Sequence, residues 1–277
     1  MVTFGRFMIC LKQEDLAIRI RLKQAASTPG LVSMSVVTLT VLRYKPLARF
    51  RAFANMGRVL MQPLQANGLT FSKLMGSGIN FGLIPDFSTY VFLGVWNDDN
   101  TALALPKTDI YRHLSQGTEQ IATLYLQPQR AHGLWDGQKP FSVDTEGAAR
   151  NRRSLVSAQA SLSTNNPVAV LTRATIRNRA LPDFWRYVPQ ARQRLTEQAH
   201  NLLFGIGVGE VPIVQQCTIS VWRDPAAVEQ YAYRQSGHKE VVRLTRERNW
   251  YSEELFARFS VLRAEGDMFA SVQRLIS

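Results

Sequence analysis

The sequence predicts an α+β fold made of two tandem ferredoxin-like repeats that pack as a pseudo-dimer within one chain. Two observations carry this prediction. The order strand–helix–strand–strand–helix–strand occurs twice, and a polar segment separates the two copies. That segment is rich in Ser, Gln, Asn, Gly and Arg, as linkers are. We expect a first repeat over 34–135, a linker over 136–167 and a second repeat over 168–277.

The first copy opens with a β-branched strand, and Pro46 then precedes a helix that ends at Gly68. Arg49, Arg51 and Arg58 occupy one face of this helix. In order, the later elements are a glycine-containing segment over 71–78, a strand over 90–96, a turn over 97–99, a helix from about Asp109 and a strand near 122–126. The opposite helix face is apolar and consists of Phe50, Phe53, Ala54, Gly57, Leu60, Met61 and Leu64.

The second copy follows the same order. Pro182 and Asp183 begin its first helix, because proline and acidic residues favour a first turn. The glycines at 205, 207 and 209 are interpreted as a sharp turn between strands, since no helix follows them to form a dinucleotide fingerprint. The elements are a strand over 168–177, a helix from 182, the glycine turn, a strand over 214–222 and helices near Val241 and over 254–262.

Alternating apolar residues predict which face of each repeated strand is buried. In the second copy Cys217, Ile219 and Val221 share one face, because strand residues two apart point the same way. In the first copy the equivalent residues are Val91, Leu93 and Val95. A cysteine inside such a strand is usually an inert core residue. We therefore expect both strands to bury one face.

The first 33 residues do not fit either repeat. Basic and apolar residues alternate near 18–23, which is typical of a segment that lies on a membrane surface. The favoured alternative is an extension before the true start at Met34, where a clean strand pattern begins. We expect a chain that begins at Met34 to fold and to keep its activity.

Composition narrows the function classes. The chain has 33 Lys and Arg against 21 Asp and Glu, a formal charge of +12, which predicts an anionic partner or surface. No helix-turn-helix, zinc-ligand or aromatic RNA-binding pattern is present, so nucleic acid is not the expected partner. Two cysteines form no disulfide framework, which fits a reducing cytoplasm.

Four histidines are candidate ligands, and they differ in context. His113 lies in a polar helix, His132 at a loop edge and His200 at a polar helix end, where structural or surface roles are usual. His238 follows Gly237 and opens a helix expected to face the sheet that carries Cys217. A neutral imidazole at that place is suited to bind a metal or haem iron. A satisfied structural histidine is the alternative.

Five segments of the chain carry a resemblance to one family. They are LMGSG at 74–78, GLWDG at 133–137, LTRATI at 171–176, GVGEVP at 207–212 and NWYSEELFARF at 249–259. In this order they resemble the spheroidene monooxygenase family, carotenoid ketolases of phototrophic bacteria. The resemblance covers about 34–266 and omits most of the linker.

The resemblance implies a function and a fold. It implies a dimeric α+β barrel that introduces a keto group at carbon 2 of acyclic carotenoids such as spheroidene, using molecular oxygen and reduced ferredoxin. It implies haem as the cofactor, with His238 as the iron ligand. On that basis Arg173 and Gln215 are candidates to stabilise bound oxygen, and strand-edge hydrogen bonding is their alternative role.

The expected location is cytoplasmic, peripheral on the inner face of the cytoplasmic membrane. A polyene is nearly insoluble in water, and a cationic protein is attracted both to anionic lipid and to an acidic ferredoxin. Two alternatives remain: a cofactor-free monooxygenase of the same superfamily, and a non-catalytic protein that binds haem or carotenoid. A Soret band in the purified protein excludes the first, and turnover excludes the second.

Overall fold

The fold is described from a computed structural model. It divides into two units, Met1–Ser33 and Met34–Ser277, and the first unit, including the doubted start, lies outside the described residues. The structure describes residues 35–62, 64–81, 84–143, 166–197, 200–231, 243, 245 and 247–277.

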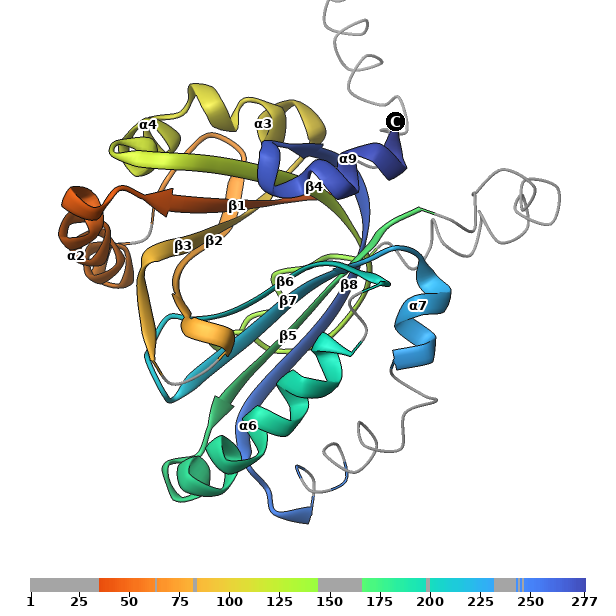
Figure 1. The fold of residues 1–277 in the computed structure, drawn as a ribbon. Helices are drawn as coiled ribbons and strands as arrows, with labels where there is room; N and C mark the ends of the chain where they lie inside the picture. The colour runs from red at the N-terminus through yellow and green to blue at the C-terminus, as the bar shows by residue number, and fades with distance from the viewer. Residues whose placement is uncertain are drawn as a thin grey trace, which may run out of the picture. The chain divides into compact units, whose positions relative to one another are not determined.

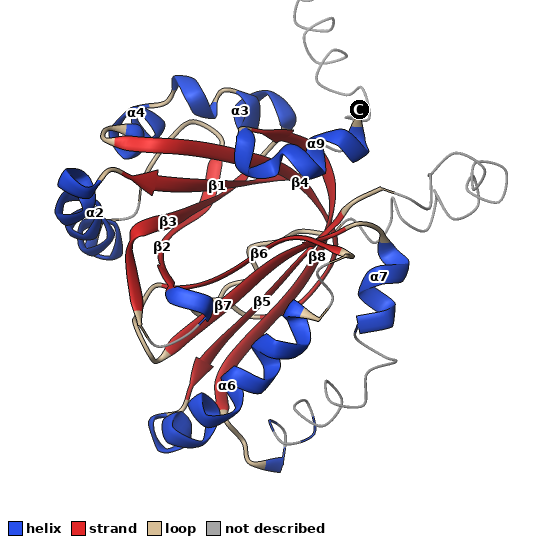
Figure 2. Cartoon of the chain, viewed as in Figure 1, coloured by secondary structure: helices blue, strands red, loops and turns tan. Residues whose placement is uncertain are grey.

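Strands dominate this unit, and helices lie on its outside (Figures 1 and 2). The strands are β1 (Val36–Tyr44), β2 (Leu69–Gly78), β3 (Pro85–Trp96), β4 (Thr118–Gly133), β5 (Val168–Ile176), β6 (Leu202–Gly209), β7 (Gln215–Trp222) and β8 (Tyr251–Glu265). The α-helices are α2 (Arg49–Met61), α3 (Asp99–Leu103), α4 (Asp109–Ser115), α6 (Leu181–Thr196), α7 (Pro225–Glu229) and α9 (Ala270–Ile276).

The described strands close into an antiparallel barrel in the order β1-β3-β2-β6-β7-β5-β8-β4. Strands β4 and β8 pair along ten residue pairs. On the opposite side β2 and β6 pair only at Gly76 with Gly209 and at Ser77 with Val208. The predicted α+β class is confirmed, and the barrel has one long and one short seam.

The barrel interior is filled with apolar side chains from its strands. Cys217, Ile219 and Val221 of β7 are buried in the same core as Val91, Leu93 and Val95 of β3, which confirms the predicted faces. A second apolar layer lies between the outer face of the first four strands and helices α2, α3 and α4. Burial of this apolar area is the main stabilising contribution to the fold.

Helix α2 turns its apolar stripe to solvent. Phe50, Leu60 and Met61 are exposed, whereas the face against the sheet consists of Ala52, Asn55 and Met56. The sequence pattern grouped Phe50, Leu60 and Met61 on the apolar face of the helix, but that face points to solvent and not to the core. In α6, by contrast, the predicted stripe contributes Phe184 and Leu195 to the core.

Two predicted elements are wrong. The glycines at 205–209 lie within strand β6 instead of forming a turn, and a Cβ on Gly207 would lie 2.8 Å from the Cα of Phe81. Residues 254–262 form part of strand β8 instead of a helix. Leu255, Ala257 and Phe259 alternate into the core, which is the period of a strand.

The predicted linker is ordered where it begins. Trp135 and Gln138 form an isolated bridge, and the buried ring of Phe141 meets Phe259 edge to face at 5.1 Å. The rest of the predicted linker, from 144 to 165, lies outside the described residues. Packed structure therefore continues at least eight residues past the expected end of the first repeat, through 143.

Candidate functional site

Five charged side chains meet at one end of the barrel, and we call them the charged cluster. A charged group is costly to bury unless it is paired, so its two deeply buried members, Arg173 and Glu210, need partners. Two members are cations and three are anions. They are Lys73, Asp136, Arg173, Glu210 and Glu253.

Strand alternation aims three of these side chains inward. Arg173 lies two residues after the buried Leu171 on β5, so both point into the barrel. Glu253 on β8 is likewise two residues from the buried Leu255. Lys73 has the same relation to Met75 on β2, whereas the other two members stand just after the ends of β4 and β6.

Arg173 is the most deeply buried cation of the cluster, with a side chain only 1% exposed. Its Nη2 lies 3.0 Å from Asp136 Oδ1, and its Nη1 pairs with Glu253 Oε1. Its guanidinium also lies over the ring of Trp135, 5.6 Å from the centroid. Charge, hydrogen bonding and a cation–π contact together fix its direction.

Glu253 is held by backbone as well as by Arg173. It accepts hydrogen bonds from the amides of Asp136 and Gly137 at 2.9 and 2.8 Å. Desolvation alone would raise the pKa of Glu253, but these amides and the Arg173 guanidinium outweigh it and lower the pKa below its ordinary value. Glu253 is therefore ionised at neutral pH.

Lys73 joins the second side of the cluster. Its Nζ lies 2.6 Å from Glu210 Oε2 and also pairs with Asp136. Desolvation lowers the pKa of Lys73, but the hydrogen bonds to Asp136 and Glu210 more than compensate, so the pKa is raised. The other carboxylate oxygen of Glu210 accepts a hydrogen bond of 2.7 Å from the indole of Trp135.

Arg173 and Gln215, the sequence-based candidates to stabilise bound oxygen, both lie at the end of the barrel that holds the charged cluster. Arg173 pairs in register with Cys217, and Thr175 with Gln215, so Arg173 and Gln215 are diagonal neighbours on the inward face. Arg173 Nε and Gln215 Oε1 are buried and have no hydrogen-bond partner among the described residues. Buried polar atoms normally have partners, so these two atoms are suited to meet a bound polar group.

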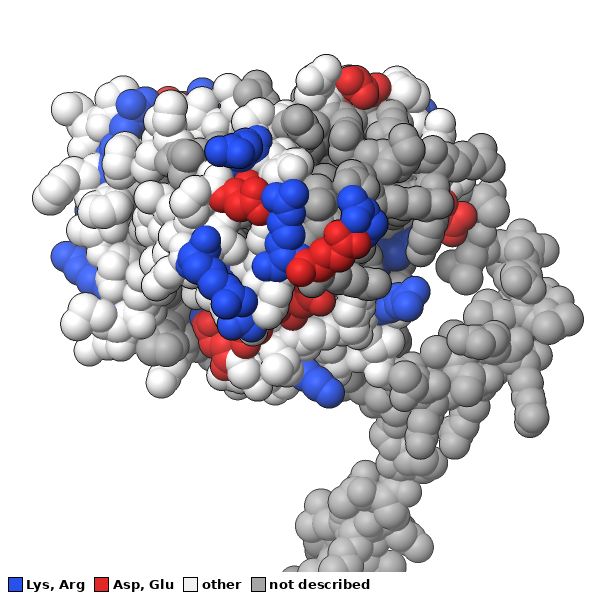
Figure 3. All heavy atoms as spheres, turned by 90° about the horizontal axis from the view of Figure 1, so that it is seen from below, with Lys and Arg blue, Asp and Glu red and all other residues white. Residues whose placement is uncertain are grey.

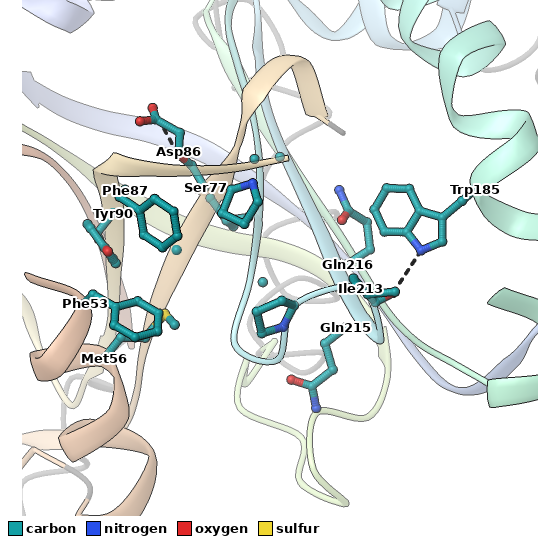
Figure 4. A pocket seen from close by; sticks show the side chains of 17 residues that line it. Phe53, Met56, Ser77, Asp86, Phe87, Tyr90, Trp185, Ile213, Gln215 and Gln216 are labelled. Atoms are coloured by element: carbon teal, nitrogen blue, oxygen red, sulfur yellow. Dashed lines mark hydrogen bonds between the residues drawn. The ribbon is translucent and has the colours of Figure 1, made fainter. Parts of the chain in front are cut away.

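A pocket of about 260 Å³ lies at the short β2–β6 seam, next to Gln215 (Figure 4). Phe53, Met56, Phe87 and Tyr90 gather on one side of it in that view, and Trp185 and Ile213 lie on the other. The Trp185 indole donates a hydrogen bond of 3.0 Å to the Ile213 carbonyl. The walls are thus mainly aromatic and aliphatic, as in small-molecule sites.

Glycines of both seam strands line the pocket. They are Gly76, Gly78, Gly207 and Gly209. A Cβ on Gly76 would lie 3.2 Å from Sδ of the pocket-lining Met56, whereas a Cβ on Gly207 or Gly209 would meet the backbone of Phe81 or Gln215. The lining includes Gly76 on the outward face of β2, whose neighbour Met75 is in the core, and the inward-facing Gln215. The pocket therefore extends from the space under α2 toward the barrel interior.

The described part of the pocket lining does not fit haem. It contains no histidine or cysteine to bind iron. Its Tyr90 is a poor phenolate ligand, because burial and then the nearby Asp86 raise its pKa to about 12. Burial likewise raises the pKa of the Cys217 thiol. Among the described residues no group of three or more His, Cys, Asp and Glu is arranged to hold a metal ion.

The predicted iron ligand, His238, lies outside the described residues. The other three histidines have local partners. His113 Nε2 is 3.1 Å from Asn55 Oδ1, and His132 stacks on Phe256 at 5.2 Å. His200 Nε2 is 3.1 Å from the side-chain amide of Asn201. None of these three lines the pocket.

Sequence reasoning missed the charged cluster itself. A signal was present, because the resembling segments supply its members one by one. Asp136 comes from GLWDG, Arg173 from LTRATI, Glu210 from GVGEVP and Glu253 from NWYSEELFARF, while Lys73 directly precedes LMGSG. Their meeting point follows only from the closure of the barrel.

Three known proteins with similar sequences carry the same name. The chain is 33% identical to the spheroidene monooxygenase of Cereibacter sphaeroides over 83% of this chain and 67% of that protein. It is 34% identical to the spheroidene monooxygenase of Rhodobacter capsulatus over 71% of this chain and 77% of that protein. It is 28% identical to the spheroidene monooxygenase of Rubrivivax gelatinosus over 83% of this chain and 84% of that protein.

Solved structures support the fold alone. Aldoxime dehydratase superposes with a TM-score of 0.52 over 84% of this chain and 83% of that chain, at 13% identity. No family model matches the sequence. The two relatives above 30% identity are each covered by this chain over at least two thirds of their length. The chain therefore belongs to the spheroidene monooxygenase family.

Proposed function

We propose that this protein is a carotenoid monooxygenase whose pocket at the β2–β6 seam receives one end of an acyclic carotenoid such as spheroidene. The observation that carries the proposal is the pocket's shape and lining. Its volume of about 260 Å³ lies just below the range of about 300–1,000 Å³ for complete small-molecule sites. It accommodates the end of a long apolar molecule, with Gln215 as a polar group at its inner side.

We propose the position that is oxidised, the oxidant and the electron donor from the resemblance to the spheroidene monooxygenase family. The enzyme introduces a keto group at carbon 2, using molecular oxygen and electrons from reduced ferredoxin. Haem is the proposed cofactor, with His238 as its ligand, and when bound it would supply the oxygen-activating chemistry. The described pocket lining itself offers no iron ligand.

The roles proposed for this chain's own residues follow from their positions. Phe53, Phe87 and Trp185 exclude water from the bound polyene. Arg173 and Gln215 present their unpartnered buried atoms to a polar group. The charged cluster holds Arg173 in one orientation, because its two carboxylate partners and Trp135 restrict the guanidinium.

Carotenoid extraction from a host that makes spheroidene tests the function. A host with the gene should accumulate a ketocarotenoid, and a host without it should not. Gly76→Val narrows the pocket, because even a Cβ at this position lies 3.2 Å from Met56 Sδ, and should lower product at least tenfold. Gly57→Ala is the control, since nothing beyond its chain neighbours and its own helix backbone lies within 4 Å of the added Cβ. Equal product from both variants contradicts the assignment of the pocket.

The cofactor is tested separately by the haem-to-protein ratio. His238→Ala should lose haem and its Soret band, whereas His113→Ala and His132→Ala should retain both. Loss of haem only in one of the latter two would move the site to the first half. A colourless parent protein that still turns over substrate would favour the cofactor-free monooxygenase, which the lack of an iron ligand in the described lining also favours. A protein that binds haem or carotenoid but does not turn over substrate would be a non-catalytic carrier.

We also propose that the two halves are tandem ferredoxin-like repeats packed as a pseudo-dimer. In support, the first four strands lie in the order β4-β1-β3-β2 and the last four in the equivalent order β8-β5-β7-β6. Asp98 caps α3 through the Thr101 amide, and Asp224 caps α7 through the Ala227 amide, each at 2.8 Å. These aspartates stand two residues after the ends of the equivalent strands β3 and β7.

The proposed location is the inner face of the cytoplasmic membrane, where the substrate dissolves. No helix among the described residues is long and apolar enough to cross a bilayer. The positive formal charge of +12 supports attraction both to anionic lipid and to an acidic ferredoxin.

A further inference from the structure

Helix α2 carries an apolar surface that nothing in the described part of the chain covers. Phe50 and Met61 are 83% and 86% exposed, far more than large apolar side chains on a packed helix. The surface, which we call the α2 face, consists of Leu47, Phe50, Phe53, Leu60 and Met61. The helix is thus apolar on two sides, one packed on the sheet and one facing outward.

The α2 face is continuous with the pocket. The ring of Phe53 meets Phe87 edge to face at 5.6 Å, and both rings line the pocket. Ile213 lines the pocket as well, and Phe53, Phe87 and Ile213 are all about half exposed. Three more exposed apolar side chains lie in the segments that join β2 to β3 and β6 to β7: Ile79, Ile84 and Val211. An apolar path therefore leads from the outward side of α2 to the pocket.

Positive charge accompanies this apolar surface. Between residues 45 and 61 the sequence has no Asp or Glu, and Lys45, Arg49, Arg51 and Arg58 are all exposed. The carboxylate in the described pocket lining is Asp86. Desolvation alone would raise its pKa, but hydrogen bonds from Ser88 and Thr89 and the charge of Arg49 outweigh it and lower the pKa. In Figure 3 the left margin, on the side where α2 lies in Figure 1, is mainly white with blue Lys and Arg.

We propose that the α2 face docks onto the surface of an anionic lipid bilayer, with the pocket opening toward the lipid. Exposed aromatic and aliphatic side chains beside a basic rim are the features by which peripheral helices bind such surfaces. A second copy of this chain is a poorer occupant, because a twofold contact would bring the same four cations together. Docking itself needs no catalysis, but its role in delivering substrate rests on the proposed carotenoid function.

Vesicle flotation with the full chain tests the proposal. The parent should float with vesicles of equal phosphatidylglycerol and phosphatidylcholine and should bind phosphatidylcholine alone at least tenfold more weakly. Lys45→Gln with Arg49→Gln should weaken binding about 25-fold, because each cation near an anionic surface contributes about a factor of five. Phe50→Ser with Met61→Ser should weaken it about tenfold or more.

Matched controls separate this face from general charge and apolarity. Lys107→Gln with Arg274→Gln removes the same two charges from exposed sites elsewhere, and Leu103→Ser removes an apolar side chain that is 46% exposed. These variants should bind vesicles like the parent. Equal losses in control and test variants, or no binding by the parent, would overturn the proposal.

Two further measurements keep the outcomes distinct. Phe50→Trp should lose more tryptophan fluorescence to brominated lipid than the parent with its five tryptophans, since the new ring enters the bilayer. If Phe50→Ser with Met61→Ser instead converts a lipid-free dimer into a monomer in sedimentation, the face is a self-association surface and the proposal is wrong. Turnover of detergent-dispersed carotenoid should be unchanged in that variant. If the parent itself does not turn over the dispersed carotenoid, the proposed function is refuted, whereas the result on vesicle binding is unaffected.

Discussion

Arg173→Met removes the central cation of the charged cluster while keeping an apolar stem of similar length. Removing one partner of a buried ion pair costs about 3–5 kcal/mol. The cost here is smaller, because Glu253 keeps two backbone hydrogen bonds and Asp136, 42% exposed, keeps Lys73. We therefore expect the free energy of unfolding to fall by about 2–3 kcal/mol at pH 7.

The loss depends on pH with a definite sign. The folded pKa of Glu253 is lowered from its ordinary value of 4.5, as backbone amides and Arg173 outweigh desolvation. Stability from a lowered carboxyl pKa is fully present above the unfolded pKa and disappears as pH falls through the folded pKa. Without Arg173 the carboxylate loses part of this stabilisation. The difference between parent and variant is therefore largest near neutral pH and shrinks below about pH 4.5.

Urea unfolding of both proteins at pH 7 and pH 4 measures these quantities. A double-mutant cycle with Glu253→Gln should give a coupling energy of about 1–3 kcal/mol. Arg43→Met is the control, because the Arg43–Glu119 pair is exposed and should contribute less than about 1 kcal/mol. A loss at Arg173 no greater than at Arg43, or a loss that does not change with pH, would refute the reasoning.

Three further predictions concern stability and reactivity. Gly209→Ala should lower the free energy of unfolding by about 2 kcal/mol, measured in urea, since its Cβ would clash with the Gln215 carbonyl oxygen. Gly57→Ala should raise it by about 0.5–1 kcal/mol, because the glycine lies inside a helix with open space beside it. Cys217 should resist iodoacetamide at pH 8 until the protein unfolds, since it is buried and burial raises its pKa. Peptide mass spectrometry would distinguish its labelling from that of Cys10, and rapid labelling of the native Cys217 would contradict its burial.

The sequence predicted those features that depend on local periodicity. The buried face of β7 was correct because Cys217, Ile219 and Val221 alternate without interruption. Strand β8 was missed although Leu255, Ala257 and Phe259 alternate equally well, because Glu253, Glu254 and Arg258 give the segment the composition of a helix. The local composition favours a helix and the two-residue alternation favours a strand. Pairing with β4 and β5 makes the segment a strand.

The candidate site was beyond local patterns. Lys73 and Glu210 are 137 residues apart, and they meet only because β2 and β6 join at the short seam. The direction of the α2 stripe was equally hidden, since both sides of the helix are apolar enough to pack. Arg173 and Gln215 were named for a role at bound oxygen that remains a prediction; their shared inward face is what the structure adds.

The two unequal seams have a consequence for aggregation. A strand whose amide and carbonyl groups lack a neighbouring strand is a template for pairing with another chain. Strands β4 and β8 satisfy each other over ten residue pairs, whereas β2 and β6 do so over two. The barrel therefore has its least-paired strand edges at one place, where Gly76, Gly78, Gly207 and Gly209 lie within the strands. Glycine has low strand propensity, so these pocket-lining residues also make the seam a poor template for an incoming strand.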